Sequence, residues 1–185
     1  MKWTLGLLAA GLAWGATTAT WELNGYQDFL RGLLDITDNR VGDKIVAHFG
    51  QDLAGRVFAL WGLAFKPNTD DIREAPSLAL IDHLLARGAS VQAYDPAAGN
   101  AALQQLEGCA GFHLCEQRDG TLEQADALIV VTEWNEFRGL DLKRIAKHMQ
   151  TPHMADLRNI YSAHDAKKAG FAAYVAVGRP ALLVD

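Results

Sequence analysis

The residues with the clearest chemical potential lie together in residues 62–73, which read GLAFKPNTDDIR. This loop holds two cations, Lys66 and Arg73, with the hydroxyl of Thr69 between them. A lysine point charge, an arginine fork, a hydroxyl and the dipole of a helix start are groups that proteins use to bind a diphosphate. The residue types are equally compatible with a solvated loop in which Lys66 pairs with a neighbouring aspartate.

The elements around this loop are predicted to place it at a ligand-binding edge. Residues 57–61 (VFALW) form a continuous apolar run of strand length, which is typical of a strand buried on both faces. Residues 75–87 have a helical apolar stripe, and Pro76 suits the first turn of a helix. In a parallel sheet, ligands bind beyond the carboxyl ends of the strands, where loops lead into helices.

The same alternation continues along the chain. Helices are predicted at residues 97–106, at 162–169 and after Asp141, which is placed to cap a helix. Further strands are predicted at residues 91–94, 112–115, 127–132, 153–155 and 173–177. The sequence therefore predicts an α/β fold, a doubly wound (Rossmann-like) parallel sheet of about five to six strands, preceded by a helical segment at residues 26–49.

Charge and composition exclude several classes of partner and site. The net charge is −5 without a Lys/Arg cluster, which argues against a nucleic-acid partner. The two cysteines, Cys109 and Cys115, do not form a CxxC pattern, and the six histidines do not form an HxxxH pair, so no metal site is expected. The apolar run near the N-terminus is too short for a confident membrane span, which takes about 20 residues.

Several longer motifs resemble those of one family. Residues 62–77 (GLAFKPNTDDIREAPS) resemble the signature of the UDP-glucose/GDP-mannose dehydrogenase family. The segments YDP at 94–96, TEWNEF at 132–137 and DLRN at 156–159 occur in the family's order and spacing. The resemblance runs from about residue 33 to 178 and is strongest to the bacterial UDP-glucose 6-dehydrogenases.

The resemblance implies the C-terminal, UDP-binding domain of an NAD-dependent enzyme that oxidises UDP-glucose to UDP-glucuronate. By position, Phe65 and Lys66 would contact the sugar nucleotide, Arg158 would meet the substrate, and Arg73 would approach the phosphates of NAD. The family has glycine where this chain has Leu157. A leucine there is unfavourable if the turn requires a positive φ, which weakens the assignment of Arg158.

The family's catalytic parts are missing from this sequence. It has no glycine-rich GxGxxG fingerprint and no GGSCFPKD segment to supply the cysteine nucleophile. No catalytic residue is therefore assigned, and the chain is expected to be inactive alone, with NAD as the cofactor of the complete enzyme. We divide it into an unmatched apolar leader (1–25), a remnant of the central dimerisation helix (26–50) and the UDP-binding domain (51–185).

Several interpretations of the whole chain remain open. It is either a truncated remnant of a dehydrogenase or a non-catalytic module that binds UDP-sugars or associates with full-length subunits, as a possible homodimer or mixed assembly. An ordinary NAD-binding Rossmann domain is opposed by the missing GxGxxG. The leader resembles a secretory signal, but nucleotide sugars and NAD favour the cytoplasm. The sugar itself, glucose, N-acetylmannosamine or a GDP-linked mannose, is not determined, and the loop around Lys66 favours UDP-glucose.

Overall fold

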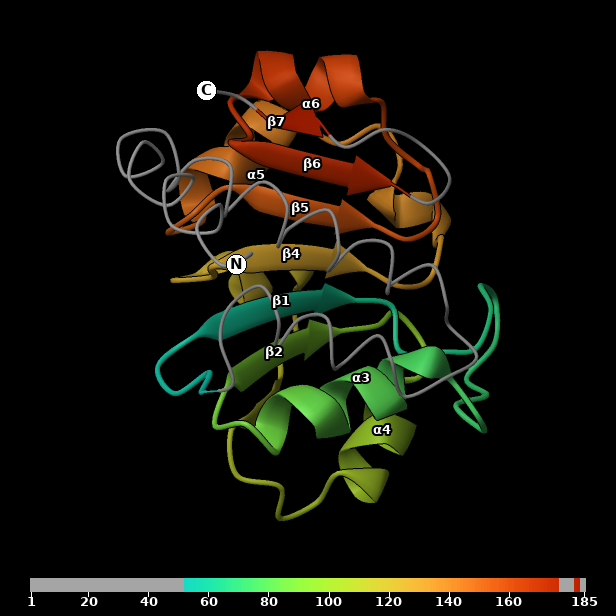
Figure 1. The fold of residues 1–185 in the computed structure, drawn as a ribbon. Helices are drawn as coiled ribbons and strands as arrows, with labels where there is room; N and C mark the ends of the chain where they lie inside the picture. The colour runs from blue at the N-terminus through green and yellow to red at the C-terminus, as the bar shows by residue number, and fades with distance from the viewer. Residues whose placement is uncertain (1–51, 177–181, 184–185) are drawn as a thin grey trace, which may run out of the picture.

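The computed structural model describes residues 52–176 and 182–183, which form a seven-stranded sheet in the order β3-β2-β1-β4-β5-β6-β7 (Figure 1). The strands are β1 (Val57–Trp61), β2 (Ser90–Tyr94), β3 (Phe112–Leu114), β4 (Ala127–Val130), β5 (His153–Asp156), β6 (Ala173–Ala176) and β7 (Leu182–Leu183). Every neighbouring pair is parallel except β6 and β7, which are antiparallel. The predicted parallel sheet is confirmed, and β7 was not predicted.

Four of the five connections between the parallel strands contain an α-helix, as the sequence predicts, whereas the connection from β3 to β4 contains only a 3-10 turn, which was not predicted. Together the connections contain α3 (Pro76–Leu85), α4 (Gly99–Gln105), α5 (Leu142–His148), α6 (Ala163–Ala169) and the short 3-10 turns η1 (Arg118–Leu122) and η2 (Asn135–Phe137). Pro76 lies in the first turn of α3, and the carboxylate of Asp141 accepts a hydrogen bond from the backbone N–H of Lys143 at 3.0 Å. The predicted leader and dimerisation helix, residues 1–50, lie outside the described residues.

The strands β1, β4, β5 and β6 are almost fully buried. In β1, residues 58–61 are buried, and all four residues of β4 are buried, because helices cover both faces of a doubly wound sheet. β2 instead alternates between buried and partly exposed residues. No helix in the described part of the chain is long and apolar enough to cross a membrane.

The strand order identifies where a ligand would bind. From β1 the chain moves to β2 and β3 on one side, then returns to β4 on the other side of β1. The change of direction between β1 and β4 is a topological switch point, outside which doubly wound sheets bind their ligands. In Figure 1 the arrowheads of β1, β4, β5 and β6 point to the same edge, where the loop after β1 projects.

Candidate functional site

The loops after β1 and β4 touch at the switch point. Gly62, the first residue after β1, has a φ of +92° and lies so close to Thr132 that a Cβ built on it would be 2.5 Å from the Thr132 Cβ. The Thr132 hydroxyl donates a hydrogen bond to the carbonyl of Ala64 at 2.6 Å. A glycine at position 62 is therefore needed both for its backbone angle and for the close approach.

A buried carboxylate, that of Asp95, joins the loops after β1, β2 and β4. The side chain of this residue, which is 7% exposed, accepts five N–H hydrogen bonds. The donors are the backbone N–H groups of Leu63, Ala64, Ala97 and Ala98 and the indole Nε1–H of Trp134, at 2.7 to 3.1 Å. These bonds compensate the charge inside the protein and fix the three loops relative to one another.

The hydrogen bonds of Asp95 also bear on whether this edge of the sheet could bind NAD. In an ordinary dinucleotide site, an acidic residue at the end of the second strand accepts the ribose hydroxyls. Here both carboxylate oxygens of Asp95 are occupied by protein N–H groups. The described residues therefore do not fit an ordinary NAD site at this edge, and Asp95 has a structural role.

The loop after β5 is organised by a second buried carboxylate. Asp156 accepts hydrogen bonds from the backbone N–H of Arg158 at 3.1 Å and of Tyr161 at 2.9 Å. The residue with positive φ in this turn is Asn159, at 55°, whereas Leu157 is not among the residues with positive φ. Leu157 does not need a positive φ here, so a leucine at this position does not strain the turn. The turn can therefore place Arg158 although the chain lacks the family's glycine.

Arg158 is anchored to the loop after β4. Its Nε–H donates to the carbonyl of Val131 at 2.5 Å, and the same Nε lies 3.1 Å from Glu133 Oε2. Its side chain is 29% exposed. Thr132 lies between Val131 and Glu133, the two residues that hold Arg158, and its hydroxyl forms a hydrogen bond with Ala64. Residues 131–133 therefore link the loop that carries Lys66 to the loop that carries Arg158.

Phe65 and Lys66 both present their side chains to solvent. Phe65 is 52% exposed although it is a large apolar side chain, and its backbone N–H donates to the Asp71 carbonyl at 2.8 Å. Lys66 is exposed and, within the residues that the structure describes, has no hydrogen bond or ion pair from its side chain. Lys66 therefore forms no direct ion pair with an aspartate among the described residues. Its charge is the smallest of the causes that lower the Asp71 pKa, so its ammonium group remains available to an anion.

Arg73 pairs with Asp71 instead. Its guanidinium donates to both carboxylate oxygens, from Nε at 2.9 Å and from a terminal nitrogen at 2.7 Å. These hydrogen bonds lower the pKa of Asp71 from 3.8 to about 2. The Arg73 side chain is 87% exposed, so a pair of this kind is weak and open to exchange with a ligand anion.

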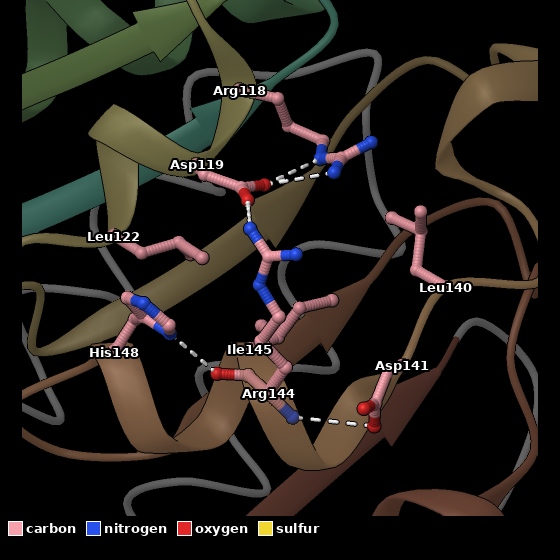
Figure 2. Close-up of a pocket in the computed structure, with 8 residues that line it drawn as sticks. All are labelled: Arg118, Asp119, Leu122, Leu140, Asp141, Arg144, Ile145 and His148. Atoms are coloured by element: carbon pink, nitrogen blue, oxygen red, sulfur yellow. Dashed lines mark hydrogen bonds and ion pairs between the residues drawn. The ribbon is translucent and has the colours of Figure 1, made fainter.

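A small pocket lies between η1 and α5 (Figure 2). Figure 2 shows the Asp119 carboxylate between the guanidinium groups of Arg118 and Arg144. The hydrogen bond from Arg118 is the main cause of a lowered Asp119 pKa. Arg118 also lies over the Trp61 ring, 5.5 Å from its centroid. Both guanidinium groups pair with the Asp119 carboxylate, so this cluster braces α5 against η1, and each of its two arginines has an ion pair, unlike Lys66.

The cysteines do not resemble activated nucleophiles. Cys109 is exposed and Cys115 partly buried, and neither forms a disulfide. Burial raises the pKa of the Cys115 thiol. A thiol of this kind stays protonated at neutral pH, whereas a catalytic cysteine needs a lowered pKa.

One functional feature was not found by reasoning from the sequence. Glu133 was quoted as part of a motif but was given no role, and the structure places its carboxylate against Arg158. Residues 133 and 158 are distant in the sequence, so their contact follows from the pairing of β4 with β5. An acidic residue directly after a buried strand was the available signal, although it does not identify a partner.

Comparisons with known proteins give one family for this chain. A model of the UDP-glucose/GDP-mannose dehydrogenase family, UDP binding domain, matches residues 59–163. A UDP-glucose 6-dehydrogenase of Rhizobium meliloti (strain 1021) is 43% identical over 148 residues, which are 78% of this chain and 33% of that protein. One from Pseudomonas aeruginosa is 46% identical over 129 residues, 68% of this chain and 28% of that protein.

Solved structures share the fold. A UDP-glucose dehydrogenase from Pyrobaculum islandicum matches with a TM-score of 0.55 and 27% identity, over 84% of this chain and 30% of that one. A UDP-D-ManNAc dehydrogenase from Pyrococcus horikoshii matches with a TM-score of 0.56 and 21% identity, over 85% of this chain and 31% of that one. The chain spans about a third of the length of the relatives that it matches.

Proposed function

Because the chain belongs to the UDP-glucose/GDP-mannose dehydrogenase family and carries that family's UDP binding domain, we propose that it binds a UDP-sugar at the edge formed by the loops after β1, β4 and β5. The observation that carries this proposal is the exposed, unpaired Lys66 beside a loop that is tied to the anchored Arg158. Lys66 and Arg158 would bind the phosphates, and Phe65 would pack on the sugar nucleotide.

The finer proposal is that the ligand is UDP-glucose and that the domain serves an NAD-dependent oxidation to UDP-glucuronate in the cytoplasm. Relatives of 43% and 46% identity named UDP-glucose 6-dehydrogenase support this substrate. Arg73, exposed on the same loop, would approach the NAD phosphates once Asp71 releases it. This chain would contribute binding, and the chemistry would come from the other parts of the enzyme.

A non-catalytic role is the second candidate. In the described residues, the partly buried thiol of Cys115 has a raised pKa and Asp95 is occupied by protein donors. Both features favour a domain that binds UDP-sugars or associates with other subunits without oxidising them. A purified chain that binds UDP-glucose but makes no UDP-glucuronate with NAD would fit both the dehydrogenase domain and the non-catalytic module.

Isothermal calorimetry of the purified chain tests the binding itself. We expect UDP-glucose to bind with a Kd below about 1 mM and NAD to bind much more weakly. The Lys66→Ala substitution should weaken the affinity for UDP-glucose at least about tenfold, because a hydrogen bond to a charged group contributes roughly 1.5 to 3 kcal/mol.

A matched control removes a lysine elsewhere. Lys147 is in the last turn of α5, which ends at the opposite edge of the sheet, so Lys147→Ala should leave the UDP-glucose affinity unchanged. Equal losses in the two variants would mean that Lys66 acts through net charge and not through a site. No heat from UDP-glucose at millimolar concentration, with a chain shown to be folded by circular dichroism, would contradict the proposal.

A further inference from the structure

We propose that Glu133 is a positioning residue, which holds the Arg158 guanidinium so that its terminal Nη groups are left for the diphosphate of the ligand. This inference rests on the proposed function and adds a residue to its site. Glu133 itself need not touch the ligand. Its effect would pass through Arg158.

Within the described part of the chain, the polar contacts of the Arg158 guanidinium all involve its Nε atom and none involves its two Nη atoms. Its Nε–H donates to the Val131 carbonyl at 2.5 Å and faces Glu133 Oε2 at 3.1 Å. Within residues 52–176, neither Nη group has a hydrogen bond or an ion pair. Four N–H donors of a side chain that is 29% exposed are therefore unused, and a fork of this kind matches two phosphate oxygens.

The carboxylate of Glu133 depends on Arg158 in turn. Its Oε2 atom is buried and accepts no hydrogen bond in the described structure. A buried carboxylate oxygen without a donor is costly unless a cation lies close. Arg158 is the one cation that pairs with Glu133 among the described residues, and the close approach of Nε to Oε2 supplies that compensation.

The physical benefit of the pair is preorganisation. A free arginine side chain has many rotamers, and a ligand that must order such a side chain binds more weakly by about 2- to 10-fold. Glu133 and the Val131 carbonyl fix the Nε side before a ligand arrives. Removing the charge at position 133 should therefore weaken phosphate binding about 2- to 10-fold while leaving the rest of the ligand's contacts intact.

A double-mutant cycle in the full chain separates positioning from a general structural role. Kd values for UDP-glucose and for uridine, which lacks the phosphates, would be measured for the original chain, Glu133→Gln, Arg158→Ala and the double variant. We expect Glu133→Gln to weaken the affinity for UDP-glucose about 2- to 10-fold when Arg158 is present and less than about 1.5-fold when Arg158 is absent. The change in uridine affinity from Glu133→Gln should be negligible.

A ligand-free measurement follows Arg158 directly. The Nε–Hε signal of Arg158 in a ¹H–¹⁵N spectrum, assigned by its loss in Arg158→Lys, should be protected from solvent exchange in the original chain and broadened in Glu133→Gln. An unchanged signal, or equal losses of UDP-glucose affinity with and without Arg158, would overturn the inference while leaving the proposed function standing. A folded chain that binds no UDP-glucose would instead contradict the proposed function and the inference with it.

Discussion

Replacing Gly62 with alanine is expected to lower the free energy of unfolding by about 3 to 5 kcal/mol. The added Cβ would lie 2.5 Å from the Cβ and 2.6 Å from the backbone nitrogen of Thr132, at a φ of +92°. Backbone strain and overpacking cost roughly 1 to 3 kcal/mol each, and both act here. Urea denaturation at equilibrium measures the loss.

Gly55 provides the matched control for this substitution. Its φ is +79°, but a Cβ built on it meets nothing within 4 Å. Gly55→Ala therefore isolates the cost of the backbone angle and should cost about 1 kcal/mol. If both variants lost the same stability, the close packing of Gly62 on Thr132 would not be a constraint on this edge of the sheet.

The second large effect is expected from Asp95→Asn, which should lower the free energy of unfolding by about 3 to 5 kcal/mol. An asparagine side chain has one acceptor oxygen and places an NH₂ group where the other oxygen accepted protein N–H groups. Depending on which oxygen is replaced, either the three donors to Oδ2 or the two donors to Oδ1 would then face an NH₂ group in place of an acceptor. Thermal and urea unfolding would both report the loss.

Asp126 is the comparable carboxylate at the opposite edge of the sheet. It is 5% exposed and accepts from the Val57 N–H at 2.9 Å and from an Arg56 Nη, also at 2.9 Å. Asp126→Asn should cost about 1 to 2 kcal/mol and leave UDP-glucose affinity unchanged. Asp95→Asn should also weaken UDP-glucose, because it releases the loop that carries Lys66. Equal ligand affinities in the two variants would contradict that link.

Much of the fold could be predicted because its buried strands have continuous apolar sequences. The buried β1 and β4 match the predicted runs at 57–61 and 127–132, and Asp141 caps α5 as expected. β7 was missed because it has two residues and pairs in antiparallel fashion at the end of the sheet. Two residues are too few to show a strand periodicity.

The site could be predicted in part. The loop that carries Lys66 could be selected as a candidate from its residue types and its position after a strand. The five donors to Asp95 and the contact of Glu133 with Arg158 could not be predicted, because both depend on loops that only the strand order brings together. The angle of Leu157 likewise could not be read from its neighbours.

A ¹H–¹⁵N titration of the full chain with UDP-glucose tests most directly whether the edge formed by the loops after β1, β4 and β5 binds the UDP-sugar. We expect chemical-shift changes concentrated in residues 64–66, 131–133 and 157–158, with none at Asp119 or Arg144 in the pocket of Figure 2. Shifts centred on that pocket, or a spectrum unchanged at millimolar UDP-glucose, would contradict binding at this edge.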